Sequence, residues 1–136
     1  MKSYAYPILC AAFVTMLVPT HARAADPFMD ARVAASEGKH AKCAKLADEA
    51  RKRDGATWHS HHLHASCTVL GAQSRKDHMT PVEYEAQIMH AVELLENLVA
   101  GPLVPMDKHR AQLGYMATEM RKQLVIDLAE MRARPQ

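Results

Sequence analysis

The sequence predicts an all-α fold of about five helices, arranged as stacked antiparallel hairpins and closed by one disulfide. After the first two dozen residues the chain is dominated by Ala, Leu, Met, Glu, Lys and Arg, which lose the least conformational freedom in a helix. It has no alternating run of β-branched and aromatic residues joined by a tight turn, which would indicate a β-hairpin. The cysteines Cys43 and Cys67 lie at equal distances from Gly55, as expected for two paired helices.

Residues 1–24 have the composition of a secretory signal peptide. Lys2 gives a basic start, residues 8–18 (ILCAAFVTMLV) carry no charge, and residues 22–24 (ARA) have the small-x-small form of a cleavage site. The apolar run of eleven residues is shorter than the roughly 20 that cross a bilayer as a helix. We therefore expect a periplasmic or secreted protein, with residues 25–136 as a single helical domain and no integral membrane segment after signal removal.

The charge balance of the expected mature chain excludes nucleic acid as a partner. The full sequence has 17 Lys and Arg against 15 Asp and Glu, and removal of Lys2 and Arg23 leaves 15 of each. A nucleic-acid-binding protein needs a concentrated positive surface. Base stacking also needs aromatic side chains. Only four remain after residue 24: Phe28, Trp58, Tyr84 and Tyr115.

The first two helices are predicted from the residues at their ends. A helix over 27–37 has Asp26 as its N-cap, a proline at its first position and Gly38 as its stop. A second helix over 39–53 precedes a turn at Gly55. Its small side chains form a narrow face that allows a close helix neighbour. That face consists of Cys43, Ala44, Leu46, Ala47 and Ala50.

A third helix, over 57–74, has two apolar faces. On a 3.6-residue period one face holds Leu63, Cys67 and Leu70. The nearly opposite face holds Trp58, Ala65, Val69 and Ala72. A helix that is apolar on two sides is expected to pack between two neighbours.

The last two helices are predicted to form a long antiparallel hairpin. Thr80 and Glu83 form a capping box around Pro81, and this helix stops at Gly101. Asp107 is expected to cap the final helix, which Arg132 and Arg134 finish. The apolar positions recur at three- and four-residue steps: Ile88, Ala91, Val92, Leu95 and Leu98 in one helix, and Leu113, Met116, Ala117, Met120, Leu124, Leu128 and Met131 in the other.

The cysteine spacing predicts a disulfide between Cys43 and Cys67. Cys43 lies twelve residues before Gly55 and Cys67 lies twelve after it. In a hairpin that turns at Gly55, both are roughly 18 Å from the turn and face one another. A disulfide needs Cα atoms within about 7 Å, and an oxidising compartment preserves it. The alternative is two separate buried thiols; without a Cys-x-x-Cys motif, a catalytic dithiol is not expected.

Part of the chain resembles a tetratricopeptide repeat. The segment Gly38-Lys39-His40-Ala41-Lys42-Cys43, with Ala47 and Ala50 after it, is similar to the middle of that repeat, where a glycine ends the first helix and small residues mark the close contacts. Cys43 stands where the family usually has alanine. The resemblance covers residues 27–72. It implies a helical stack whose groove binds a peptide or another protein.

The run ATWHSHHLHASC (56–67) contains four histidines, His59, His61, His62 and His64. Neutral imidazole binds copper, nickel and zinc. Histidines at i and i+4 chelate best, and this spacing does not occur among the four. No face of the helix gathers more than two of them. They could instead be solvated or groove-lining side chains, or a pH-responsive contact, because histidine titrates near 6.5.

The sequence contains no recognisable catalytic constellation. The serines lie in no nucleophile-elbow motif, and there is no Gly-rich phosphate loop. We therefore predict a protein without catalytic activity and without a required cofactor, acting as an adaptor, inhibitor or immunity-type partner of another periplasmic protein or peptide. The expected contact residues are His61, His64 and Thr68, on the polar stripe of the third helix. The alternative prediction is a protein that binds or senses Cu, Ni or Zn through the four histidines.

Overall fold

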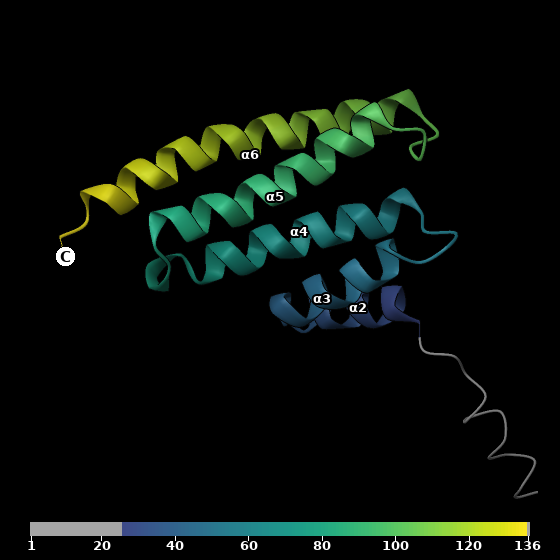
Figure 1. The fold of residues 1–136 in the computed structure, drawn as a ribbon, viewed down its shortest axis with the longest axis horizontal. Helices are drawn as coiled ribbons and strands as arrows, with labels where there is room; N and C mark the ends of the chain where they lie inside the picture. Colours follow the sequence, from purple (N-terminus) through teal and green to yellow (C-terminus); the bar gives the residue numbers. More distant parts are fainter. Residues whose placement is uncertain (1–25, 136) are drawn as a thin grey trace, which may run out of the picture.

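The computed structural model describes residues 26–135, which form five α-helices and one short 3₁₀ helix and contain no strand (Figure 1). This confirms the all-α prediction. The signal peptide predicted for residues 1–24 lies outside the described residues. The elements are α2 (Pro27–Ser36), α3 (His40–Arg51), α4 (Trp58–Ser74), η1 (Lys76–His78), α5 (Pro81–Ala100) and α6 (Asp107–Ala133).

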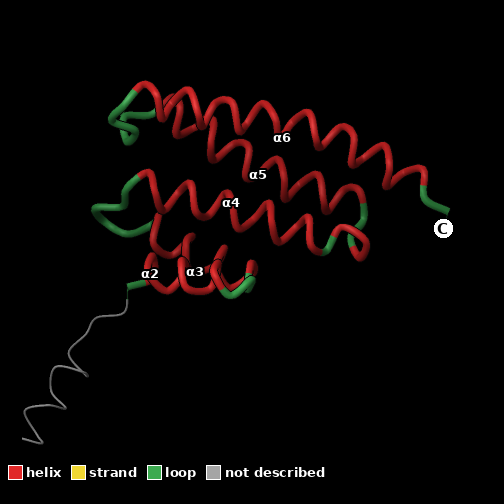
Figure 2. Tube along the Cα trace, turned by 180° about the vertical axis from the view of Figure 1, so that it is seen from behind, coloured by secondary structure: helices red, strands yellow, loops and turns green. Residues whose placement is uncertain are grey.

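Successive helices run antiparallel and pack side by side. In Figures 1 and 2, α5 lies between α4 and α6, and the shorter helices α2 and α3 lie on the other side of α4. α4 therefore has a neighbour on each of two sides, as its two apolar faces predict. None of the helices in residues 26–135 combines the length and the apolar character that crossing a membrane requires.

The helix ends follow most of the predicted signals. Asp26 Oδ1 accepts hydrogen bonds from the backbone N–H groups of Phe28 (3.1 Å) and Met29 (3.3 Å). Gly38 follows α2 with φ of 72°, a left-handed conformation that glycine adopts without steric cost. The capping box is present: Thr80 Oγ1 accepts from the Glu83 N–H at 3.2 Å, and Glu83 Oε2 accepts from the Thr80 N–H at 2.9 Å.

The predicted cap of the last helix is wrong. Met106 is the N-cap of α6, without a side-chain capping bond, and Asp107 is the first helical residue. Its carboxylate still lies at the positive end of the helix dipole, which is favourable. At the other end Arg132 lies in the last turn, as predicted, whereas Arg134 follows the helix and forms an ion pair with Asp77 at 2.7 Å.

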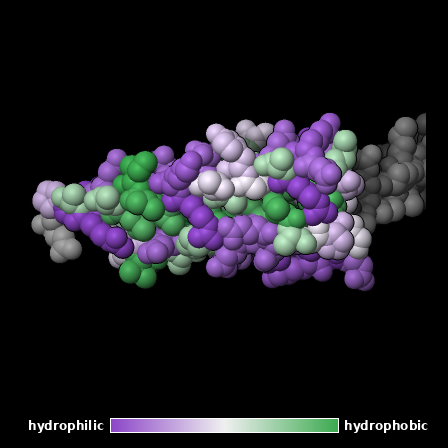
Figure 3. Space-filling model, turned by 90° about the horizontal axis from the view of Figure 1, so that it is seen from above, coloured by the Kyte–Doolittle hydropathy of each residue, from purple (hydrophilic) through white to green (hydrophobic). Residues whose placement is uncertain are grey.

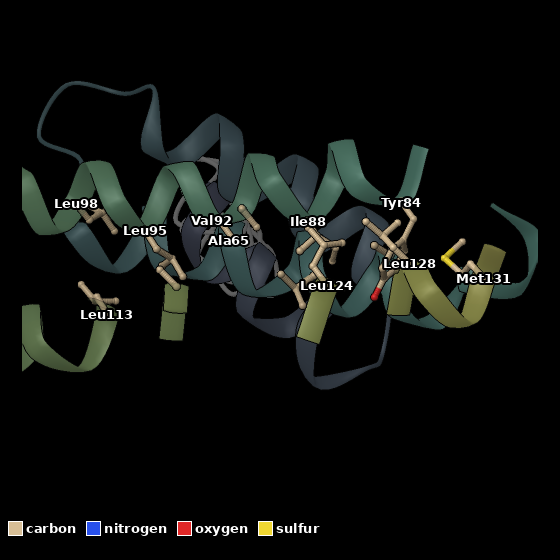
Figure 4. Packing of buried hydrophobic residues seen from close by; sticks show 14 of the residues in the cluster. Ala65, Tyr84, Ile88, Val92, Leu95, Leu98, Leu113, Leu124, Leu128 and Met131 are labelled. Carbon is tan, nitrogen blue, oxygen red and sulfur yellow. The ribbon is translucent and has the colours of Figure 1, made fainter. Parts of the chain in front are cut away.

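The helices α4, α5 and α6 share a core of large side chains. Figure 4 shows residues of α5 and α6 facing each other along the hairpin, with Ala65 of α4 beside them. Every apolar position predicted for α5 is buried. In α6 Met116 and Met120 are partly buried and the other predicted positions are buried.

A smaller core joins α2, α3 and α4. It consists of Ala31, Ala34, Cys43, Ala47 and Cys67. The Cys43–Cys67 disulfide is confirmed, with Cα atoms 5.9 Å apart. The prediction for Leu70 is wrong, because this side chain is 46% exposed. Gly71 faces α3 instead, and a Cβ placed there would lie 3.4 Å from the Cβ of His40.

Candidate functional site

His64 lies in the middle of the α4 polar stripe, and its side chain is almost inaccessible to solvent. This ring is buried between α3 and α5, with Nδ1 2.8 Å from the backbone oxygen of Ala44 and Nε2 3.2 Å from Nε2 of His90. Burial lowers the pKa of His64, and this effect outweighs the opposing influence of the Ala44 hydrogen bond and the Asp48 carboxylate. The ring thus connects three helices and offers little surface to another molecule.

The two other predicted contact residues have different surroundings. Thr68 is half-buried, and its hydroxyl donates to the backbone oxygen of His64 at 2.8 Å, within α4. His61 is also half-buried and lines a pocket of about 230 Å³ with Arg51, Leu94 and other residues. Burial and the Arg51 charge lower the pKa of His61. The predicted stripe is therefore open to a small group only at its His61 end.

His59 and His62 lie on another side of α4, around Trp58. The Trp58 ring centre is 4.0 Å from that of His59, 6.2 Å from that of His62 and 5.1 Å from that of His109. Burial, followed by the effect of His59, lowers the pKa of His62. The histidine run thus points in several directions. Within residues 26–135 no group of three or more His, Cys, Asp or Glu is arranged to hold a metal ion.

A groove crosses the face formed by α4, α5 and α6. Its volume is about 310 Å³, with Tyr84 and Ile88 of α5 between residues of α4 and α6. The full lining is Val69, Gln73, Tyr84, Ile88, Glu119, Met120, Gln123, Leu124 and Asp127. We call this site the α4–α6 groove. Its interior is largely apolar, and its polar groups are two amides, two carboxylates and one phenol, without a cation.

A buried carboxylate supports this groove. Asp127 is only 4% exposed and accepts three hydrogen bonds: from Tyr84 Oη at 2.5 Å, from Gln123 Nε2 at 3.0 Å and from Lys76 Nζ at 3.4 Å. Burial by itself would raise the pKa of Asp127, but these partners together hold it below the ordinary value. Burial and the bond to Asp127 raise the pKa of Tyr84. The carboxylate is therefore an ionised acceptor that fixes α5, η1 and α6 relative to one another.

Sequence reasoning missed both Asp127 and the groove. A signal for Asp127 was present, since it falls in step with Leu124, Leu128 and Met131 on the apolar stripe of α6. A charged residue in such a position is unusual unless it has a buried partner. Nothing in the sequence indicates that the partner is Tyr84, which lies 43 positions away.

Comparison with known proteins adds no relative. No protein-family model, no curated protein and no solved structure matches this chain.

Proposed function

We propose that this protein is a non-catalytic interaction module, periplasmic or secreted, that binds an apolar and basic segment of another protein in the α4–α6 groove. The observation that carries the proposal is the lining of that groove, which has a largely apolar interior, an exposed carboxylate, Glu119, at its edge and no Lys or Arg among its residues. Interfaces commonly combine an apolar centre with a polar rim. The Cys43–Cys67 disulfide supports an oxidising compartment.

The side chains that line the groove indicate which residue types the bound partner segment should contain. Val69, Ile88 and Met120 offer contacts to a branched or thioether side chain. Glu119 is exposed at the edge, and its only ion pair in the described residues is an exposed one with Lys122 at 3.2 Å. Exposed pairs of this kind contribute little, about 0–1 kcal/mol, so an incoming Lys or Arg can replace Lys122. A segment with a Leu or Met beside a basic residue therefore fits the groove best.

The first part of the experiment identifies the segment. A photo-reactive amino acid replaces Gln73, which is exposed at the groove, and the chain is expressed with its signal peptide in the producing cell. The same amino acid replaces Glu49 on the exposed face of α3 as a control. We expect a crosslink from position 73 that is missing from position 49, to a partner segment with adjoining apolar and basic residues.

The second part measures binding of a synthetic peptide with the crosslinked sequence. Glu119→Lys should weaken peptide binding at least about 5-fold, because it places like charges together. Glu49→Lys makes the same charge change away from the groove and should leave binding unchanged. Equal effects of the two variants, or a crosslinked segment without basic residues, would refute this groove as the binding site.

The second candidate function is binding of Cu, Ni or Zn. Its support does not come from the run of four histidines as a group, because their side chains diverge around α4. It comes from one histidine of the run and a second histidine on α5. The favourable observation is the close approach of His64 and His90.

A further inference from the structure

The imidazole of His64 is held in one orientation by the backbone of α3. The oxygen of Ala44, 2.8 Å from Nδ1, can only accept a hydrogen bond, so Nδ1 carries the proton. In the neutral ring the lone pair then lies on Nε2. A histidine that binds a metal through one nitrogen and donates from the other to a backbone carbonyl has this same arrangement.

The lone pair of His64 points toward a second imidazole nitrogen. Nε2 of His90 lies 3.2 Å from Nε2 of His64. Two imidazole nitrogens bound to one tetrahedral zinc ion at 2.0–2.1 Å are about 3.3 Å apart. A hydrogen bond from His90 to His64 has a similar length. The same two side chains can therefore share either a proton or a metal ion without moving apart.

A carboxylate lies next to this pair. Asp48 Oδ1 is 3.9 Å from Nε2 of His64, and it is a buried oxygen without a hydrogen-bond partner. Arg51 Nε is 2.6 Å from it, but the contact lacks the geometry of a hydrogen bond. Lys52 Nζ pairs with the other oxygen, Oδ2, at 2.9 Å. Asp48 is therefore the anionic group beside Nε2 of His64, and its side chain has to rotate away from Arg51 to act as a ligand.

We infer that His64 and His90, with Asp48 as the third ligand after this rotation, bind a divalent transition-metal ion of the zinc type. Two imidazoles and one carboxylate with an open fourth position are a common ligand set for zinc. Binding requires the His90 proton to lie on Nδ1, so that both Nε2 lone pairs face the ion. His90 is exposed on α5, which gives the ion a path from solvent. We call this the His64–His90 site.

The surrounding charges set the strength of the site. Arg51 and Lys52 both attract the Asp48 carboxylate, so the metal competes with two cations for its third ligand. This competition predicts a weak, exchangeable site. It also explains why the described residues do not present three ligands already in place.

The test uses untagged protein and zinc as the probe. Calorimetry at pH 7.5 in a buffer that does not chelate should show one zinc ion per chain. His90→Gln keeps an amide donor toward His64 but removes the ligand, and should weaken zinc binding at least about 10-fold, since disturbing an outer-shell partner alone costs that much. The matched control is His59→Ala, which removes an exposed histidine of the run and should leave zinc binding unchanged.

A second measurement uses the wild-type chain and does not depend on any variant. On adding zinc, the ¹⁵N resonances of His64 Nε2 and His90 Nε2 should move together, while those of His59 stay in place. No zinc binding, or shifts at His59 and His62 without shifts at His64 and His90, would overturn the inference. The site shares no residue with the α4–α6 groove, so Glu119→Lys should retain zinc and the two proposals can fail separately.

Discussion

The α2–α3 end of the stack and the α5–α6 end bury side chains of very different size. The small core at the first end contains three alanines and the two cysteines, whereas the large core contains Tyr84, Ile88, Leu95 and other bulky residues. Hydrophobic stabilisation is about 25 cal/mol per Å² of apolar surface removed from water, so alanines contribute little each. Small side chains let α3 and α4 approach closely, and the close approach permits the Cys43–Cys67 disulfide. One end is therefore stabilised by a covalent bond and the other by packing.

The large core also contains a network of buried hydrogen bonds. Asp127 is buried there with Tyr84, Gln123 and Lys76 as donors. Because one carboxylate contacts three segments of the chain, it favours a single register of α6 against α5. The small core therefore contains a covalent bond between two helices, whereas the large core contains a hydrogen-bond network between three segments.

Removal of the disulfide should have the largest effect. The double variant Cys43→Ala with Cys67→Ala is expected to lose about 3.5 kcal/mol of unfolding free energy, as the chain-entropy model gives for a loop of this length. Hydrogen exchange should show that the amides of α2 and α3 lose their protection first, while those of α5 and α6 remain protected. Reduction of the wild-type protein serves as a control and should reproduce the loss. Equal loss of protection at both ends would contradict the comparison.

Tyr84→Phe should have the next largest effect on the unfolding free energy, and it acts at the α5–α6 end of the stack. It leaves the buried Asp127 with one donor fewer, which costs about 1–3 kcal/mol. Chemical denaturation measures the change. Tyr115 is 68% exposed, and Tyr115→Phe is therefore the matched control with no expected effect. If Tyr84→Phe leaves the unfolding free energy unchanged, the hydrogen bonds from Gln123 and Lys76 are sufficient to stabilise the buried Asp127 carboxylate.

Acidification should lower the stability by a smaller amount than either substitution. The contributions of His64 and Asp127 should be lost in different pH ranges. The pKa of His64 lies below its ordinary 6.5 because of burial, although Asp48 opposes the shift and Arg51 and His90 reinforce it. Since the fold favours the neutral ring, this stability is complete above pH 6.5 and declines as pH falls below 6.5 toward the folded-state pKa. The pKa of Asp127 is lowered from 3.8, so its contribution is present above 3.8 and is lost only as pH falls through its folded-state pKa.

Thermal melts across this pH range check the prediction. The wild-type melting temperature should begin to fall near pH 6.5, and His64→Gln should reduce that first decline while leaving the more acidic one in place. A first decline that is unchanged in His64→Gln would assign it to His61 or His62, whose pKa values are also lowered by burial.

The helices, most of their ends and the disulfide could be predicted from the sequence, and the cap of α6 could not. Asp26, Gly38, Thr80 and Glu83 act on backbone groups within four residues of themselves, so local sequence is sufficient to predict them. The cysteine pair could be predicted because the rise per residue of a helix converts equal spacing from a turn into equal height.

The side chains that meet across the stack could not be predicted from the sequence. Leu70 has the correct period for a buried face, yet Gly71 faces α3, because the position and angle at which two helices cross are set by their packed surfaces. The pairs Tyr84–Asp127 and His64–His90 are 43 and 26 positions apart. Helical periodicity places each of these residues on a face of its own helix. It carries no information about the residue on the neighbouring helix, and the groove and the histidine pair both depend on that second residue.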